Sequence, residues 1–217
     1  MNLFTRRNIG IALGMATAVA LTAGALISFT ADAAPSKIGP GDIAPAFTGS
    51  TSTGAEIALS DFAGKTVVLE WTNDGCPFVQ KHYAEPFRNM QTLQERADLD
   101  GTVWISIISS APGKQGHVDG AAAEEINDER GATPRYTILD PTGEIGRAYG
   151  AKTTPHMFVI KGDGEIAYAG AIDSIRSARV NDIAKATNYV SAALDAISAG
   201  EPVEVASSAP YGCSVKY

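Results

Sequence analysis

The stretch KTVVLEWTNDGCPFVQKHY, residues 65–83, constrains the fold more than any other part of the chain. Its first part, Thr66 to Trp71, is mostly apolar or β-branched, which is typical of a central strand covered on both faces. The polar turn Thr72 to Gly75 then delivers Cys76 to the start of a predicted helix. Pro77 favours a helix start there, because its missing N–H is one of the donors that a first helical turn cannot use.

A thiol at Cys76 faces free backbone N–H groups and the positive end of the helix dipole. Both favour the thiolate, which is the reactive form of cysteine. We therefore interpret Cys76 as a nucleophile; the alternative is a small buried core thiol. Asp74 acts against the thiolate, because a nearby carboxylate raises the pKa of a thiol.

The first 33 residues have the pattern of an export signal. Positive charge at Arg6-Arg7 precedes an uncharged apolar run from Ile9 to Phe29, and Ala31-Asp32-Ala33 supplies a small-x-small cleavage site. We expect export to the periplasm or the cell exterior, and the arginine pair also permits the twin-arginine route. An uncleaved membrane anchor is the alternative, since about 21 apolar residues can span a bilayer.

The charge balance excludes several kinds of partner. The chain has 17 basic and 24 acidic residues and a formal net charge of −7. This disfavours nucleic acid and anionic membrane surfaces, so contact with a membrane is expected only if the leader is uncleaved. No phosphate-binding loop or paired-carboxylate motif stands out, and no cofactor is predicted.

Cys76 and Cys213 are the two cysteines of the chain. Two are too few for a disulfide-stapled scaffold, and a chain of this size does not need one. We predict redox chemistry, with Cys213 as a resolving cysteine, provided that the two Cα atoms come within about 4.4–6.8 Å. A structural disulfide that pins the tail, two unrelated thiols, and a disulfide relay through a separate partner protein remain open.

The rest of the chain reads as a linker (34–41), one domain (42–200) and a tail (201–217) that carries Cys213. The helix from Pro77 should run to about Ala97, with a kink or break near Ala84–Glu85 caused by Pro86. We expect the tail to be irregular from residue 206. The other predicted elements are a strand pair within 43–64, strands at 102–109, 136–139, 156–161 and 165–171, and helices at 121–130, 144–149 and 181–198.

This order predicts an α/β, thioredoxin-like three-layer fold with a central mixed β-sheet flanked by helices. Helices that follow buried strands imply a parallel component, and the turn Lys161-Gly162-Asp163-Gly164 implies an antiparallel hairpin. The strand pair within 43–64 adds an N-terminal β-hairpin extension.

Three segments resemble the redoxin branch of the thioredoxin-fold superfamily: VVLEWTNDGCPFVQKHY, LDPTGEIGRAYGAKTTPHMFVI and PYGCSVKY. That branch holds the alkyl hydroperoxide reductase/thiol-specific antioxidant family and exported thiol–disulfide oxidoreductases. The resemblance covers roughly residues 38–200. It implies a protein disulfide or a peroxide as substrate and an external thiol as reductant.

Position by position, Cys76 resembles the attacking cysteine of a thioredoxin, and Val79 stands where the second cysteine would be. Glu70 falls at the place of the buried acid that assists proton transfer. Thr154-Pro155 resembles the loop with a cis proline that faces the active cysteine. The peroxiredoxin pattern Pro-x-x-x-Thr-x-x-Cys is absent, because Leu69 and Asn73 occupy its first two places.

The predicted site therefore has two parts. The catalytic candidates are Cys76, Cys213, Glu70 and Pro155, and the substrate-binding candidates are Pro77, Phe78, Thr154 and His156. The alternative is a non-catalytic thioredoxin-fold module that binds copper or a client protein. Cys76, Cys213 and His156 would be the copper ligands, although Gln80 stands where a copper chaperone has its second cysteine.

Overall fold

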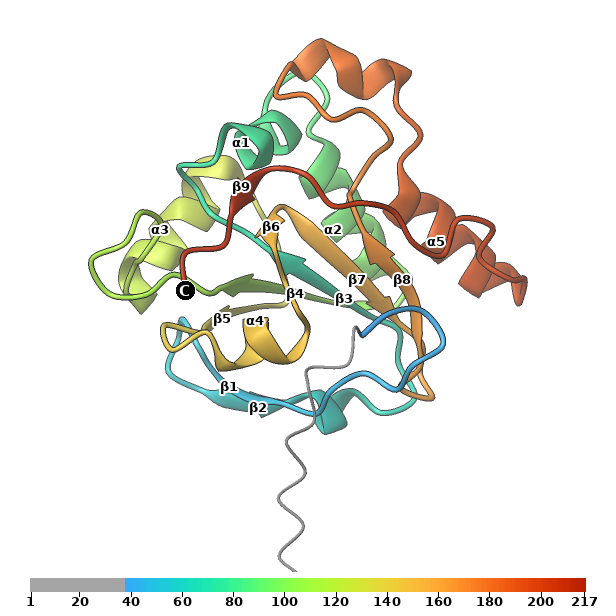
Figure 1. Cartoon of the computed structure of the whole chain (residues 1–217), viewed down its shortest axis with the longest axis horizontal. Helices are drawn as coiled ribbons and strands as arrows, with labels where there is room; N and C mark the ends of the chain where they lie inside the picture. Colours follow the sequence, from blue (N-terminus) through green and yellow to red (C-terminus); the bar gives the residue numbers. More distant parts are fainter. Residues whose placement is uncertain (1–37) are drawn as a thin grey trace, which may run out of the picture. The chain divides into compact units, whose positions relative to one another are not determined.

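A computed structural model describes residues 38–217, which form an α/β fold around a seven-stranded mixed sheet (Figure 1). The strand order is β2-β1-β5-β4-β3-β7-β8, and β6 and β9 form a separate two-stranded sheet. The strands are β1 (Thr48–Thr51), β2 (Glu56–Ala58), β3 (Val67–Trp71), β4 (Val103–Ile108), β5 (Tyr136–Leu139), β6 (Thr153–Thr154), β7 (His156–Ile160), β8 (Ile166–Gly170) and β9 (Cys213–Ser214).

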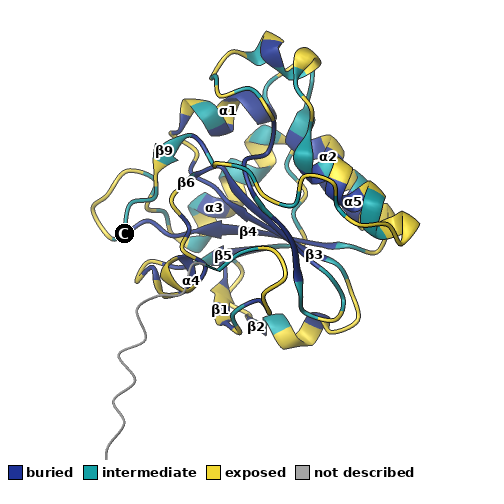
Figure 2. Cartoon of the chain, turned by 45° about the vertical axis from the view of Figure 1, so that its right-hand side comes forward, coloured by how far each residue is buried: buried dark blue, intermediate teal, exposed yellow. Residues whose placement is uncertain are grey.

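The predicted central strand is confirmed. Every residue of β3 is buried, and β3 pairs in parallel with β4 and antiparallel with β7 (Figure 2). The predicted N-terminal hairpin is also present: β1 pairs antiparallel with β2 and then with β5, so it extends the sheet on the β5 side. The mixed sheet flanked by helices is therefore the predicted one.

The two faces of the sheet carry two separate cores. One core gathers Leu69, Trp71 and Phe158 from the strands with Ile145 of α4 (Glu144–Ala148) and the following Tyr149. The other gathers strand residues with apolar side chains of α1 (Pro77–Tyr83), α2 (Asn89–Leu99) and α5 (Tyr189–Ala199), and it contains Cys76. Alternation along β7 separates Met157 and Phe158 into different cores, as the two-residue period of a strand requires.

The long helix predicted from Pro77 is two helices, so the break is confirmed and the continuous run to Ala97 is wrong. α1 ends at Tyr83, and the Glu85–Pro86 peptide is cis before α2 begins at Asn89. The Gln91 side chain donates to the Tyr83 carbonyl at 2.8 Å. This bond satisfies an acceptor that the end of a helix leaves free.

The closing helix also differs from the prediction of 181–198. A 3-10 segment, Val180–Lys185, comes first, and α5 begins at Tyr189. Asn188 is the cause, because its side chain accepts from the Ser191 N–H at 2.9 Å and caps a new helix there. The remaining helix, α3 (Gly120–Arg130), lies close to the predicted range.

The tail is more ordered than predicted, because it forms β9 along β6 (Figure 1). The predicted leader, residues 1–33, lies outside the described residues. Within residues 38–217, the helices are all too short or too polar to cross a membrane.

Candidate active site

Cys76 lies at the N-terminus of α1, as predicted, and none of its surface is exposed. Its backbone is extended, and its carbonyl accepts the N–H groups of Val79 and Gln80 at 2.9 Å each. Pro77 occupies the first helical position and is exposed to solvent. The predicted position at a helix start is therefore correct. The complete burial of the thiol was not predicted, and it comes from the loop before β7 and the tail, which pack against it.

The loop before β7 faces the thiol. The Thr154–Pro155 peptide is cis, and the Cys76 thiol donates a hydrogen bond to the Thr154 carbonyl at 3.1 Å. The Thr154 hydroxyl is buried and has no partner among the described residues. A buried hydroxyl without a hydrogen-bond partner costs free energy, so its presence at this position requires an explanation. A thiolate at Cys76 would supply the missing acceptor.

The tail brings Cys213 to the same place. β9 pairs antiparallel with β6, which sets Cys213 opposite Thr154, and Cys213 packs against the core that contains Cys76. Gly212 permits the approach. A Cβ on Gly212 would overlap the Thr154 carbonyl oxygen and lie 2.8 Å from its carbonyl carbon, and its φ of 136° suits glycine. Both cysteines are free thiols in this structure.

The two thiols have opposite pKa shifts. Burial raises the pKa of Cys76, but donors that would stabilise the thiolate, the side chains of Cys213 and Thr154 and the N–H groups of Cys213 and Val79, outweigh it, so the net pKa is lowered. Burial and the neighbouring Cys76 raise the pKa of Cys213 to about 11. Cys76 is therefore the member of the pair that forms a thiolate first.

A buried polar cluster, which sequence reasoning missed, anchors the tail two residues before Cys213. The Tyr211 hydroxyl donates to Asp173, and Lys81 of α1 donates to Asp173 at 2.9 Å and to the Ile175 carbonyl at 3.3 Å. The Lys81 side chain is 0 % exposed, and Asp173 is 3 % exposed. The Tyr211 ring also packs edge-on against Phe78, with centroids 5.8 Å apart. We call Lys81, Asp173 and Tyr211 the tail anchor.

Comparison with known proteins identifies the family of the chain. The family model described as Redoxin matches residues 39–187. The chain belongs to the redoxin family. An uncharacterised conserved protein from Geobacillus kaustophilus has 25 % sequence identity and a TM-score of 0.71, with 82 % of this chain and 92 % of that chain covered. A hypothetical protein from Sinorhizobium meliloti 1021 has 20 % identity and a TM-score of 0.70, covers 84 % of this chain and 96 % of its own, and supports the fold alone. No curated protein matches.

Glu70 of this redoxin lies at the predicted buried position, with no exposed surface. Its carboxylate accepts from the Tyr83 hydroxyl at 2.8 Å and the Trp104 indole at 2.9 Å, and Ser106 and Gln94 donate as well. No hydrogen bond joins it to Cys76 among the described residues. Lys81 does not pair with Glu70, because its ammonium pairs with Asp173. Through these hydrogen bonds Glu70 connects β3 to α1, α2 and β4. Its role as a proton relay stays a prediction.

The structure does not bring His156 to the thiol. Its ring packs at a tilt against Phe158, with centroids 4.8 Å apart. Phe158 belongs to the core on one face of the sheet, and Cys76 belongs to the core on the other face. In residues 38–217, no three His, Cys, Asp or Glu side chains are grouped as metal ligands. The copper site from Cys76, Cys213 and His156 is therefore not assembled.

The concern about Asp74 also does not hold. Its carboxylate pairs with the Arg130 guanidinium at 3.1 Å. The largest causes of the shift of the Cys76 pKa are instead burial and the donors from Cys213, Thr154 and Val79. The polar turn is instead fixed by its own contacts, because Asn73 and Gln115 exchange hydrogen bonds through their side-chain amides.

Two buried histidines have lowered pKa values, from which we expect acid to destabilise the redoxin. Burial lowers the pKa of His82 to about 4, with Asp173 opposing and Lys81 adding to the effect. Burial and Lys152 lower the pKa of His156 to about 4. Because the unfolded chain binds these protons at about pH 6.5, we expect the free energy of unfolding to fall between pH 6.5 and 4, with a slope of at most about 1.4 kcal/mol per pH unit for each histidine.

Urea unfolding of wild type, His82→Gln and His156→Gln over this pH range measures the slope. Each variant should lose part of the wild-type slope. An unchanged slope in both variants would assign the acid sensitivity to other groups.

Proposed function

We propose that this redoxin is an exported thiol–disulfide oxidoreductase in which Cys76 is the nucleophile and Cys213 resolves the intermediate. The observation that carries the proposal is the pairing of β9 with β6, which sets Cys213 opposite Thr154, the residue whose carbonyl accepts from the Cys76 thiol. A nucleophilic thiolate with a second thiol beside it is the minimum that two-step disulfide exchange needs.

The reaction would proceed in two exchanges. The Cys76 thiolate attacks one sulfur of a substrate disulfide, forms a mixed disulfide and expels the other substrate sulfur as a thiolate. Cys213 then loses its proton and attacks the Cys76 sulfur, which expels the second substrate thiolate and leaves a Cys76–Cys213 disulfide. The substrate has gained two electrons, and two equivalents of an external thiol return the pair to the reduced form.

The pKa order supports this assignment of roles. The lowered pKa of Cys76 gives it the larger thiolate fraction in the first step. The pKa of about 11 at Cys213 keeps that sulfur protonated and available as a donor until Cys76 has reacted. Formation of the mixed disulfide removes the charge of Cys76, which is one of the causes that raise the pKa of Cys213, so the second thiol becomes easier to ionise.

A peroxide is the second candidate substrate, and the burial of Cys76 favours it. A sulfur with no exposed surface is more accessible to a molecule of two heavy atoms than to a folded protein disulfide. The Cys76 thiolate would attack one peroxide oxygen, break the O–O bond and release the other oxygen as water or an alcohol, which leaves a sulfenic acid. The Cys213 thiolate would then attack the Cys76 sulfur and release water to form the same disulfide. A protein substrate requires the tail to move first.

Mass spectrometry of the reduced protein tests the assignment. After bis(2-hydroxyethyl) disulfide or, separately, hydrogen peroxide, wild type should lose two hydrogens in an intramolecular disulfide. Cys213→Ser should instead accumulate the mixed disulfide or the sulfenic acid on residue 76. Cys76→Ser should react no faster than a free thiol of ordinary pKa.

Retention of full activity in Cys76→Ser would overturn the proposal. So would a wild-type protein that reacts with neither oxidant, which would favour a non-catalytic binding module. If Cys213→Ser turns over with an external thiol at the wild-type rate, the resolving thiol belongs to a partner and not to the tail.

A further inference from the structure

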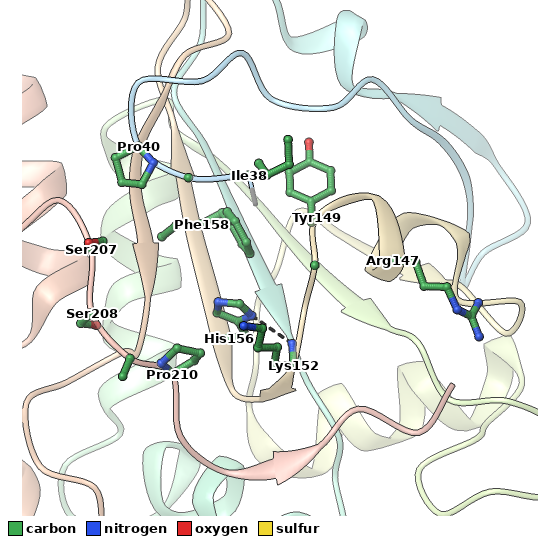
Figure 3. Close-up of a pocket in the computed structure, with 14 residues that line it drawn as sticks. Ile38, Pro40, Arg147, Tyr149, Lys152, His156, Phe158, Ser207, Ser208 and Pro210 are labelled. Atoms are coloured by element: carbon green, nitrogen blue, oxygen red, sulfur yellow. Dashed lines mark hydrogen bonds between the residues drawn. The ribbon is translucent and has the colours of Figure 1, made fainter. Parts of the chain in front are cut away.

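A cavity of about 830 Å³ is lined by Phe158, which belongs to the core on the face of the sheet opposite α1. Figure 3 shows the side chains that line it. Five segments form its walls: residues 38–40, the end of α4 with the following loop to Lys152, strand β7, Ala169 of β8, and the tail at 207–210. Its volume lies within the range of pockets that hold small molecules. The walls therefore come from parts of the chain that only the fold brings together.

The floor of the cavity is mostly apolar. Phe158 and Tyr149 contribute buried aromatic rings, and Ile38, Pro40 and Pro210 close the sides. The Tyr149 hydroxyl is already used, because it donates to the Pro45 carbonyl at 2.8 Å. The aromatic floor thus presents ring surface, and not polar groups, to whatever enters.

One buried polar group faces this floor. The backbone N–H of Lys152 donates to Nδ1 of His156 at 3.3 Å, so Nδ1 is an acceptor and a neutral ring carries its proton on Nε2. His156 is 6 % exposed, and Nε2 forms no hydrogen bond with any of residues 38–217. Figure 3 shows the ring among the lining side chains, with this nitrogen turned away from the Lys152 backbone. The lowered pKa of His156 agrees with a neutral ring.

One cation at the rim is also without a partner. The Lys152 side chain lines the cavity, is exposed, and forms no ion pair with another described residue. Arg147 is engaged elsewhere, because its guanidinium lies 4.6 Å from the centre of the Tyr217 ring and donates to the Thr142 carbonyl. An unpaired ammonium and a buried N–H donor that line the same cavity favour an anion.

We propose that this cavity binds a small aromatic carboxylate, with its ring on Phe158 and its carboxylate between the His156 Nε2–H and the Lys152 ammonium. A carboxylate fits the two donors that face the cavity, and charge-assisted hydrogen bonds are about twice as strong as neutral ones. A phosphate group fits less well, because its three oxygens would require more donors than this apolar wall supplies. The proposal is independent of the redox role of the two cysteines.

The probe is 2-naphthoate, with the neutral 2-naphthamide as its matched control. Titration calorimetry on the reduced full-length protein should give one site for 2-naphthoate. The amide should bind at least about tenfold more weakly, since it lacks the charge that Lys152 pairs with. Heteronuclear NMR of the same titration should shift the signals of residues 149–158 and 207–210.

Three variants locate the site. His156→Phe keeps a ring but removes the donor, and Lys152→Gln removes the charge; each should weaken 2-naphthoate binding about five- to tenfold. Ser207→Trp places a large side chain on an exposed wall residue and should block the cavity without disturbing the core. Thermal unfolding checks that each variant is folded, and Lys161→Gln, on the β7–β8 turn, is the matched charge control.

Equal affinity for acid and amide would overturn the proposal, because the carboxylate would then not be recognised. Binding that survives all three variants would also overturn it by placing the probe elsewhere. A lack of saturable binding at millimolar probe would have the same consequence.

Discussion

Gly212→Ala is expected to separate the two thiols while leaving the domain folded. An added Cβ would overlap the Thr154 carbonyl, which belongs to the backbone and cannot rotate away. β9 would therefore leave β6, and Cys76 would lose the side-chain and backbone donors of Cys213 that lower its pKa. We expect Cys76–Cys213 disulfide formation to slow by tenfold or more, since a tethered but unplaced thiol loses most of its effective concentration.

Alkylation of Cys76 by iodoacetamide across pH gives a two-part signature. In Gly212→Ala the midpoint of the pH profile should rise, because donors to the thiolate are gone. The limiting rate at high pH should increase, because the tail no longer buries the sulfur. Gly200→Ala is the control for alanine at a positive φ: its φ is 70°, nothing lies within 4 Å of an added Cβ, and the tail contact is unaffected. A wild-type profile in Gly212→Ala would show that β9 is not what lowers the pKa.

The centre of the site could be predicted because its signals are local. A buried run, a polar turn and Cys76-Pro77 lie within a dozen residues, and each feature indicates a strand end or a helix start by itself. These features depend on short-range propensities that the sequence displays directly. Thr154-Pro155 was identified differently, by its resemblance to the cis-proline loop of the thioredoxin-fold superfamily, and it directly precedes strand β7.

The parts that were missed depend on long-range contacts. β6 and β9 have two residues each, which is too short for any periodicity to appear. Lys81 and Asp173 are 92 positions apart, and each reads alone as a solvated surface charge. The prediction that His156 lies at the Cys76 site was wrong. The sequence does not show which face of the sheet the first residue of β7 takes, and in the structure His156 lies on the face opposite to that of Met157.

The tail anchor leads to the second large expected effect. Asp173→Asn keeps the shape of the side chain but leaves the Lys81 ammonium, which is 0 % exposed, without a counter-charge. Removing one partner of a buried ion pair costs about 3–5 kcal/mol. Tyr211 loses its charged acceptor at the same time, so the tail should detach before the rest of the domain unfolds.

Urea unfolding gives the global loss, and hydrogen exchange separates the tail from the core. The control is Lys81→Met combined with Asp173→Asn, which removes both charges and should recover most of the stability, because an uncompensated buried charge is the main cost. If the single variant loses less than about 1 kcal/mol, Lys81 must reach solvent in solution and the anchor is weaker than its burial indicates. If the double variant recovers stability but not the rate of Cys76–Cys213 disulfide formation, the anchor positions Cys213 through Tyr211 and does not merely hold the fold together.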